Sequence, residues 1–167
     1  MRRLVEILDS ISEITGKYCS WMIIILMLLV VFEVIMRRFF NSPTIWSFEI
    51  TIQLYAFLFM ITAAYGLLHD SHVSVDIVYE RFGRRPKAIL DVISYLIFFY
   101  PFFIILLIKG IPYAAKSWAV YEKSWSAFAP PLYFIKTVIP LTAVLLLIQG
   151  TSKFIRQLYF AVKGEAL

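Results

Sequence analysis

Charged residues are scarce in this sequence, at 16% of 167 residues, while 61% of the residues are hydrophobic. A soluble domain of this length is usually about 45–50% apolar. The excess is concentrated in four apolar runs, each long enough to cross a bilayer, which takes about 20 residues. The sequence therefore predicts an all-α integral membrane protein with almost no extramembrane domain, in which residues 1–167 form a single domain.

Cysteine and histidine are nearly absent, which excludes several kinds of site. The single cysteine, Cys19, leaves no internal disulfide, and neither it nor Ser20 has a histidine partner for nucleophilic catalysis. The two histidines, His69 and His72, share one loop, where a metal site would need further ligands. A haem anchor subunit normally carries histidines within opposed helices, and no predicted span contains one. We therefore expect no enzyme activity, no metal site and no cofactor.

Free-standing basic segments are also missing, although the net charge is +5. No basic stripe stands outside the apolar runs, so we expect no nucleic-acid partner. In a membrane protein, Lys and Arg first report orientation, because they accumulate on the cytoplasmic side. Ten of them lie with the termini and the middle loop, and six lie on the other side. We therefore predict cytoplasmic N and C termini, with residues 159–167 as a cytoplasmic tail.

The apolar runs predict four transmembrane helices, at about residues 18–39, 45–68, 88–111 and 131–158. Residues 18–158 then form a four-span bundle. Pro101 and Pro140 lie within the third and fourth runs, where a proline removes a backbone hydrogen bond, so we expect a kink at each.

Three shorter helices are expected beside the spans. Apolar residues recur at the helical period before the first span and predict an amphipathic helix at 4–17, within the N-terminal segment 1–17. This helix either lies on the membrane surface or runs into the first span. Residues 73–82 predict a short interfacial helix, although their alternating pattern also fits an extended segment. In this connector, His72 and Asp76 are expected to hydrogen-bond at a helix start.

The third short helix is expected at residues 112–128, between the last two spans. Aromatic rings prefer the boundary between lipid and water, and this segment mixes them with charges. Its interfacial aromatic residues, together with one at the start of the second span, are Trp46, Trp118, Tyr121 and Trp125.

Charges of both signs gather where the first two spans are joined. Glu33 and Arg37 are spaced i, i+4 in the favoured order, so they can pair along one helix face. The short turn at Asn41 makes the spans antiparallel neighbours and brings Arg37 and Arg38 level with Glu49. The whole group comprises Glu33, Arg37, Arg38, Asn41, Glu49 and Gln53.

Two interpretations of this group compete. Ionisable groups in a membrane are first suspected of lining a substrate or ion path. Here the charges nearly balance, they cluster at one hairpin, and no ladder of polar groups crosses the membrane. Transporters also usually show broken helices, often in paired repeats, and none is visible. We therefore favour a structural clamp over a transport path.

Three stretches together resemble a known family. They are "RRFFNSPTIWSFE", "HDSHVSVDIVYERF" and "PPLYFIKTVIPLTAVLLLIQG". Their order and spacing resemble the small membrane subunit of tripartite ATP-independent periplasmic (TRAP) transporters, the DctQ-like family. The matching positions are Arg37, Asn41, Trp46, Glu49, His72, Val73, Val75, Asp76 and Pro140. One departure is Phe48, where the family often has a second acidic residue, which weakens any argument for a cation site there.

The resemblance implies a role and partners. Such a subunit forms a heterodimer with a large membrane subunit, an elevator that holds the substrate and sodium sites, in the bacterial inner membrane. A periplasmic binding protein delivers an organic acid, a carboxylate or sulfonate. The small subunit would be a scaffold, surrounded by membrane lipids, whose clamp lies at the subunit interface and whose aromatic residues face the docked binding protein.

Two other functions stay open from the sequence. The chain could form a self-sufficient small transporter or channel by oligomerising, in which case it would move a solute alone in liposomes. The least favoured alternative is a haem or quinone membrane anchor of a respiratory enzyme.

Overall fold

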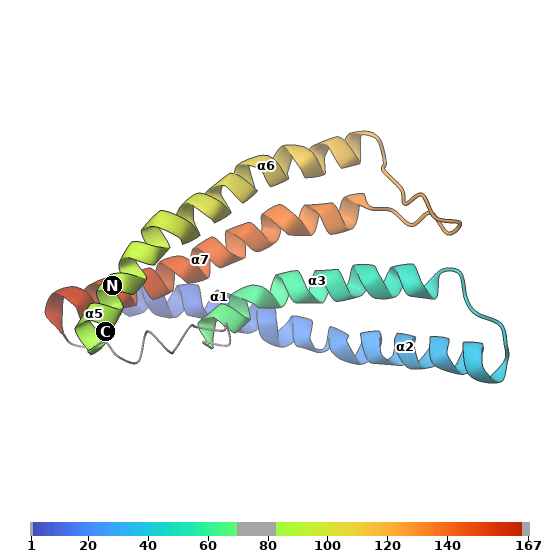
Figure 1. Ribbon diagram of the computed structural model, residues 1–167, viewed down its shortest axis with the longest axis horizontal. Helices are drawn as coiled ribbons and strands as arrows, with labels where there is room; N and C mark the ends of the chain where they lie inside the picture. Colours follow the sequence, from blue (N-terminus) through green and yellow to red (C-terminus); the bar gives the residue numbers. More distant parts are fainter. Residues whose placement is uncertain (1, 70–82, 165–167) are drawn as a thin grey trace.

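The computed structural model describes residues 2–69 and 83–164, and its regular elements there are all helical. Figure 1 shows α1 (Arg2–Ser20), α2 (Met22–Phe39), α3 (Ser47–Leu68), α5 (Arg84–Ser94), α6 (Tyr100–Ala119) and α7 (Tyr133–Lys163). A π-helical turn, Tyr95–Phe99, joins α5 to α6. Four helical stretches are long and apolar enough to cross a membrane, so the chain is a multi-pass membrane protein. The four predicted spans are confirmed, with shifted ends.

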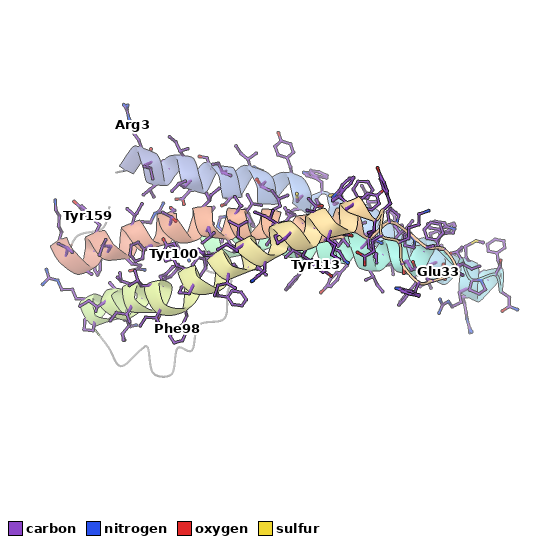
Figure 2. All side chains as sticks on the ribbon, turned by 90° about the horizontal axis from the view of Figure 1, so that it is seen from above. Arg3, Glu33, Phe98, Tyr100, Tyr113 and Tyr159 are labelled. Atoms are coloured by element: carbon purple, nitrogen blue, oxygen red, sulfur yellow. The ribbon has the colours of Figure 1, made fainter. Side chains whose placement is uncertain are left out.

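The amphipathic helix runs directly into the first span. Trp21 alone separates α1 from α2, and its N–H still donates to the carbonyl of Tyr18 at 3.3 Å. The two helices form one rod, with Arg3 and Glu33 toward its opposite ends in Figure 2. The sequence allowed this helix either to lie on the membrane surface or to run into the first span, and the second arrangement is observed.

The third span is one long helix with a widened turn. Tyr100 donates its N–H to the carbonyl of Tyr95, five residues back, which defines the π turn. Pro101 follows directly and has no N–H of its own, so the regular ladder is interrupted at this point. The helix path is curved in Figure 1. The sharp kinks expected at Pro101 and Pro140 stay predictions.

The spanning helices stand in a row. Figure 1 shows the order α6, α7, α3, α2, with α3 and α7 in the middle. Apolar residues of these two helices meet in the core, which contains Ile61, Ala64, Leu67, Val138, Leu145 and Leu146. The outer helix α2 has no buried residue among those described, so its sides are open to lipid or to another protein.

The helix α1 turns inward a side that mixes polar and apolar residues. It packs against α3 and α7, with Val5 and Ser12 at 2% and 1% exposure. Gly16 allows the close approach, because a Cβ there would collide with the ring of Tyr65. The apolar stripe that predicted this helix faces outward instead, with Ile7 63% exposed. This is expected in a bilayer, because lipid rather than water surrounds the chain.

The prediction of a separate interfacial helix at 112–128 is wrong. α6 continues to Ala119, because its small residues Gly110, Ala114 and Ser117 form a stripe buried against α7. Beyond it the chain is an irregular loop, in which Tyr121 has a positive φ of 46° and Lys123 bridges Pro131.

Two further predictions have different outcomes. The helix or extended segment predicted at 73–82, with His72 and Asp76, lies outside the described residues.

Both ends of the described chain lie at the same end of the bundle in Figure 1, as four spans require. Which side of the membrane they face stays a prediction.

Candidate functional site

The charged hairpin is centred on Glu33. Arg37, one turn later on α2, donates to its carboxylate at 3.0 Å. Thr44, in the segment between α2 and α3, donates its hydroxyl to the other carboxylate oxygen. The side chain of Glu33 is only 13% exposed, against 67% for Arg37. The carboxylate therefore ties the end of one span to the connection that starts the next.

Local backbone features hold this connection in place. Asn41 adopts a positive φ of 48°, a conformation that asparagine tolerates better than most residues. The N–H of Ser42 donates to the carbonyl of Met36 at 3.2 Å and so closes the end of α2. Trp46 stacks on Phe32 of α2, with ring centroids 6.0 Å apart. The turn expected at Asn41 therefore lies where the sequence placed it.

Glu49 and Gln53 form no ion pair or hydrogen bond with the arginines in the part of the chain that the structure describes. Within the described residues no ion pair joins Glu49 to Arg37 or Arg38, and its Oε2 atom is buried without a hydrogen-bond partner. Gln53 lines a different hollow, beside Phe57 and Val138 between α3 and α7. The pairing of Glu49 with the arginines expected from the sequence is therefore not seen in this chain.

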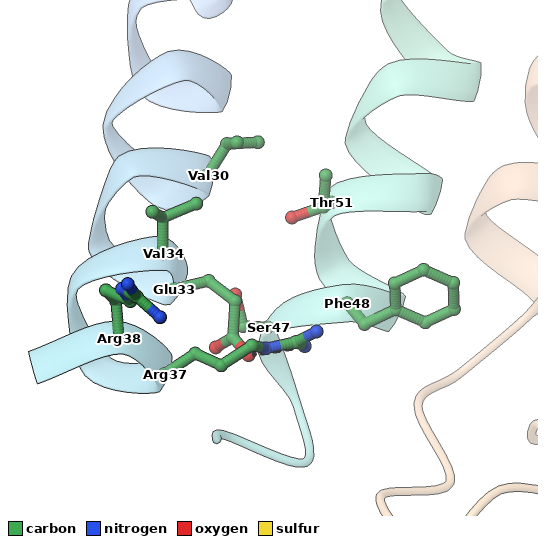
Figure 3. Close-up of a pocket in the computed structure, with 8 residues that line it drawn as sticks. All are labelled: Val30, Glu33, Val34, Arg37, Arg38, Ser47, Phe48 and Thr51. Carbon is green, nitrogen blue, oxygen red and sulfur yellow. Dashed lines mark hydrogen bonds and ion pairs between the residues drawn. The ribbon is translucent and has the colours of Figure 1, made fainter. Parts of the chain in front are cut away.

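A groove of about 720 Å³ opens between α2 and the start of α3. In Figure 3, Val30 and Thr51 lie across from each other, while Glu33 and Arg37 lie nearer the connecting segment. The residues that line the groove are Val30, Glu33, Val34, Arg37, Arg38, Ser47, Phe48 and Thr51. Its charged end thus lies at the end of the span, and its apolar part extends along the span.

Aromatic residues gather at the same end of the bundle, around the loop of residues 120–132. Trp118 donates its ring N–H to Thr137 at 2.8 Å and packs on Tyr133 with centroids 4.3 Å apart. Tyr121 meets Tyr133 edge-on. Trp125 contacts little of the chain and is fully exposed, with a relative exposure of 102%. The loop therefore presents one free indole ring on a packed aromatic base.

Glu122 ties this loop to α7. Its backbone accepts from Leu132 at 2.9 Å, and its carboxylate accepts from the ammonium of Lys136 at 2.5 Å. The hydrogen bond from Lys136 holds the pKa of Glu122 below its usual range. The Lys136 ammonium also lies 4.4 Å from the ring centre of Tyr113 on α6. This residue of α7 is thus linked to both the loop and α6.

A second polar network lies at the opposite end of the bundle and was not predicted. The carboxylate of Asp9 on α1 accepts from Gln149 at 3.0 Å and from Ser152 at 2.5 Å, both on α7. Arg156, one turn further along, also donates to it. Gln149 and Ser152 are fully buried, so this network joins α1 to α7 inside the protein.

A sequence signal for this network existed. Asp9 and Ser12 lie on one side of α1, and Gln149, Ser152 and Arg156 repeat at helical spacing near the end of the last span. Polar residues on matching faces of two apolar helices indicate a contact between them. Nearby, His69 and Glu13 are within 2.8 Å and join the end of α3 to α1.

Residues 26–159 match the family model described as tripartite ATP-independent periplasmic transporters, DctQ component. The match covers both sides of the charged hairpin, the groove and the loop that carries Trp125. No curated protein matches the chain.

Proposed function

The chain belongs to the DctQ family, the small component of tripartite ATP-independent periplasmic transporters, and from this membership we propose that it is a static scaffold for the large membrane subunit. This family is a transporter component and not an enzyme family. The main support for the proposal is family membership. The packing of the spans and the open faces of the outer helices add to it. In the proposed complex the large subunit binds and moves the substrate, while this chain supports it from one side.

The packing of the spans supports a scaffold. The middle of the row, where α3 meets α7, is filled by apolar side chains such as Ile61 and Leu146. The two polar networks around Glu33 and Asp9 lie at opposite ends of the bundle, and this apolar core lies between them. A solute path would need polar groups along its length.

The open faces of the row provide contact surface for a partner. α2 has no buried residue among those described, and the most apolar stretch of the third span has no buried residue either. Each face is continuous aliphatic and aromatic surface that another membrane helix could cover. We propose that one of these faces packs against the large subunit and that the other meets lipid.

Glu49 supplies a specific contact in this proposal. A buried carboxylate oxygen without a partner is costly, so such groups normally find a donor. We propose that the large subunit provides that donor, which places Glu49 and the neighbouring Glu33–Arg37 pair at the subunit interface.

The remaining roles follow the family. We propose uptake of an organic acid, a carboxylate or sulfonate, coupled to sodium, across the bacterial inner membrane. A periplasmic binding protein would dock over the aromatic end, where Trp118 and Tyr121 pack at the base of the loop that presents Trp125 and Trp46 packs on Phe32 of the hairpin. The exposed indole of Trp125 suits a transient protein contact, because tryptophan is enriched where interfaces gain most energy.

Co-purification tests the scaffold role. A tagged chain is expressed with the large subunit encoded beside it, as wild type and as Arg37→Ala, Glu49→Ala and Trp125→Ala. We expect Arg37→Ala and Glu49→Ala to reduce recovery of the large subunit about tenfold, the loss of one charged hydrogen bond at an interface. Trp125→Ala is the matched control, which keeps the large subunit but lowers uptake that depends on the binding protein.

Two results would contradict the proposal. Unchanged recovery and unchanged uptake for both Arg37→Ala and Glu49→Ala would remove the interface role of the hairpin. Solute flux through liposomes that contain this chain alone would replace the scaffold with a self-sufficient transporter.

A further inference from the structure

The groove between α2 and α3 is charged at one end and apolar along the rest of its length, and the scaffold role does not explain this arrangement. Its end near residue 38 carries two guanidinium groups, and its other wall residues include Val30, Val34 and Phe48. From residue 30 to residue 38 a helix rises about 12 Å, which is a large part of one bilayer leaflet. The groove therefore passes from the membrane boundary into the hydrocarbon.

The charges at the boundary do not cancel within the groove. Glu33 is held by Arg37 and Thr44, so the pair is neutral. Arg38 lines the same groove and, within the described residues, makes no ion pair or hydrogen bond. Among the residues that line the groove, one positive charge is left over, and Glu49 in the first turn of α3 is not one of them.

The opposite wall adds donors of its own. Ser47 is the first residue of α3 and is completely buried, and its hydroxyl has no hydrogen-bond partner in the described chain. The first N–H groups of a long helix also lack intrahelical partners, and the helix dipole favours an anion there. In Figure 3 the side chain of Arg37 extends from α2 toward this same turn.

We propose that this groove binds one phospholipid, with its phosphate held by Arg38, Arg37 and the start of α3. A guanidinium matches two phosphate oxygens at once, and the single excess charge complements a monoanionic phosphodiester. The lipid's acyl chain lies against Val30, Val34 and Phe48. A free phosphate ion would leave this apolar length unfilled, and an apolar partner helix would leave Arg38 without an anion. The excess charge selects an anionic headgroup such as phosphatidylglycerol over a zwitterionic one.

Native mass spectrometry of the purified full chain tests this binding. The detergent-solubilised protein is titrated with phosphatidylglycerol and, separately, with phosphatidylcholine of the same acyl chains. We expect phosphatidylglycerol to bind about fivefold more tightly, the effect of about one cationic side chain near a lipid surface. Equal affinity for the two lipids would overturn the proposal.

Two variants and one control locate the site. Arg38→Gln removes the excess charge but leaves the Glu33–Arg37 pair, and it should abolish the preference for phosphatidylglycerol. Val34→Phe fills the groove without changing any charge, and it should weaken both lipids. Lys116→Gln removes an exposed charge from the same end of the molecule and should change neither affinity. Helix content measured by circular dichroism checks that each variant is folded.

Further arms distinguish the other occupants. Displacement of phosphatidylglycerol by an equal concentration of inorganic phosphate would assign the site to a free anion and overturn the proposal. Loss of the Arg38-dependent lipid when the large subunit is bound would assign the groove to the protein interface, with the same consequence. The lipid proposal is supported if phosphatidylglycerol stays bound, in an Arg38-dependent way, both with inorganic phosphate present and with the large subunit bound. The lipid titrations of the chain alone do not depend on whether the chain acts as a scaffold.

Discussion

At the scale of single residues, Asp9 joins two helices through three hydrogen-bond donors. One side chain, 15% exposed, accepts from Gln149, Ser152 and Arg156 and so fixes α1 to α7. A hydrogen bond to a charged group contributes about 1.5–3 kcal/mol, and loss of the acceptor leaves buried donors unsatisfied. We expect Asp9→Ala to lower the free energy of unfolding by about 2–4 kcal/mol.

Denaturant unfolding in detergent micelles, followed by circular dichroism, measures this loss. Lys17→Ala is the matched control, because Lys17 is an exposed charge on the same helix with no described partner. Equal stability of Asp9→Ala and Lys17→Ala would show that the contact between α1 and α7 does not depend on this carboxylate.

Glu122 gives the loop at 120–132 a dependence on pH. Its pKa is lowered in the folded chain by the hydrogen bond from Lys136, so the unfolded chain takes up a proton first as the pH falls. The stabilisation is therefore complete above the ordinary glutamate pKa of about 4.3 and is lost as the pH falls through the lowered folded value.

Hydrogen exchange of residues 120–132 tests this expectation. At neutral pH the wild type should be more protected than Glu122→Gln, because only the carboxylate holds Lys136 as an ion pair. Once the pH has fallen below the lowered pKa of folded Glu122, the two proteins should exchange at the same rate, since protonation makes the wild type resemble the amide. A constant ratio across the whole range would show that the ion pair does not order the loop.

At the scale of helices, two glycines set how closely neighbours approach. A Cβ on Gly16 would overlap the first atoms of the Tyr65 side chain, which the backbone of α3 holds in place. A Cβ on Gly150 would meet the far edge of the Phe99 ring, which can turn aside. We expect Gly16→Ala to cost about 2–3 kcal/mol and Gly150→Ala about 1 kcal/mol.

Thermal unfolding of the two variants beside Gly83→Ala measures this order. Gly83 has only an ordinary contact of 3.8 Å with Pro86, so its variant should match the wild type. A larger loss for Gly150→Ala than for Gly16→Ala would show that the π turn and α7 pack more rigidly than α1 and α3.

The sequence predicted the spans because hydropathy is a local property. It also predicted the Glu33–Arg37 contact, since i, i+4 spacing fixes that pair within one helix. The contact of Glu49 with the arginines required a particular rotation of α3 about its axis, which spacing along the chain does not determine. For the same reason, the helical period predicted that α1 has a polar and an apolar face. It did not show that Asp9 would face α7.

The end of the third span was missed for a different reason. Interfacial aromatic residues and three charges after residue 112 indicated a change of element. The small residues Gly110, Ala114 and Ser117 nevertheless continue one buried stripe along α6. Packing against α7 therefore extended the helix past the point where composition predicted its end.

At the scale of the whole molecule, both termini lie at one end of the bundle and the loop with Trp125 at the other. The distribution of Lys and Arg predicts that the termini lie in the cytoplasm. In a Cys19→Ser background, we expect Ala127→Cys to react with a membrane-impermeant maleimide in intact cells with a permeable outer membrane. Val162→Cys should react only after lysis. The reverse pattern would invert the predicted orientation.

The unequal lengths of the helices have a consequence for the host membrane. α3 has 22 residues, about 33 Å of helix, close to a hydrocarbon thickness of about 30 Å. Its last residue, Leu68, lines the same hollow as Asp9 and Arg156, so that network lies where the hydrocarbon ends. A thicker bilayer would draw these charges into the acyl chains, while a thinner one would leave the apolar end of α3 in water. The length of α3 should therefore make the chain sensitive to bilayer thickness, and shortening the acyl chains around it should tilt the row.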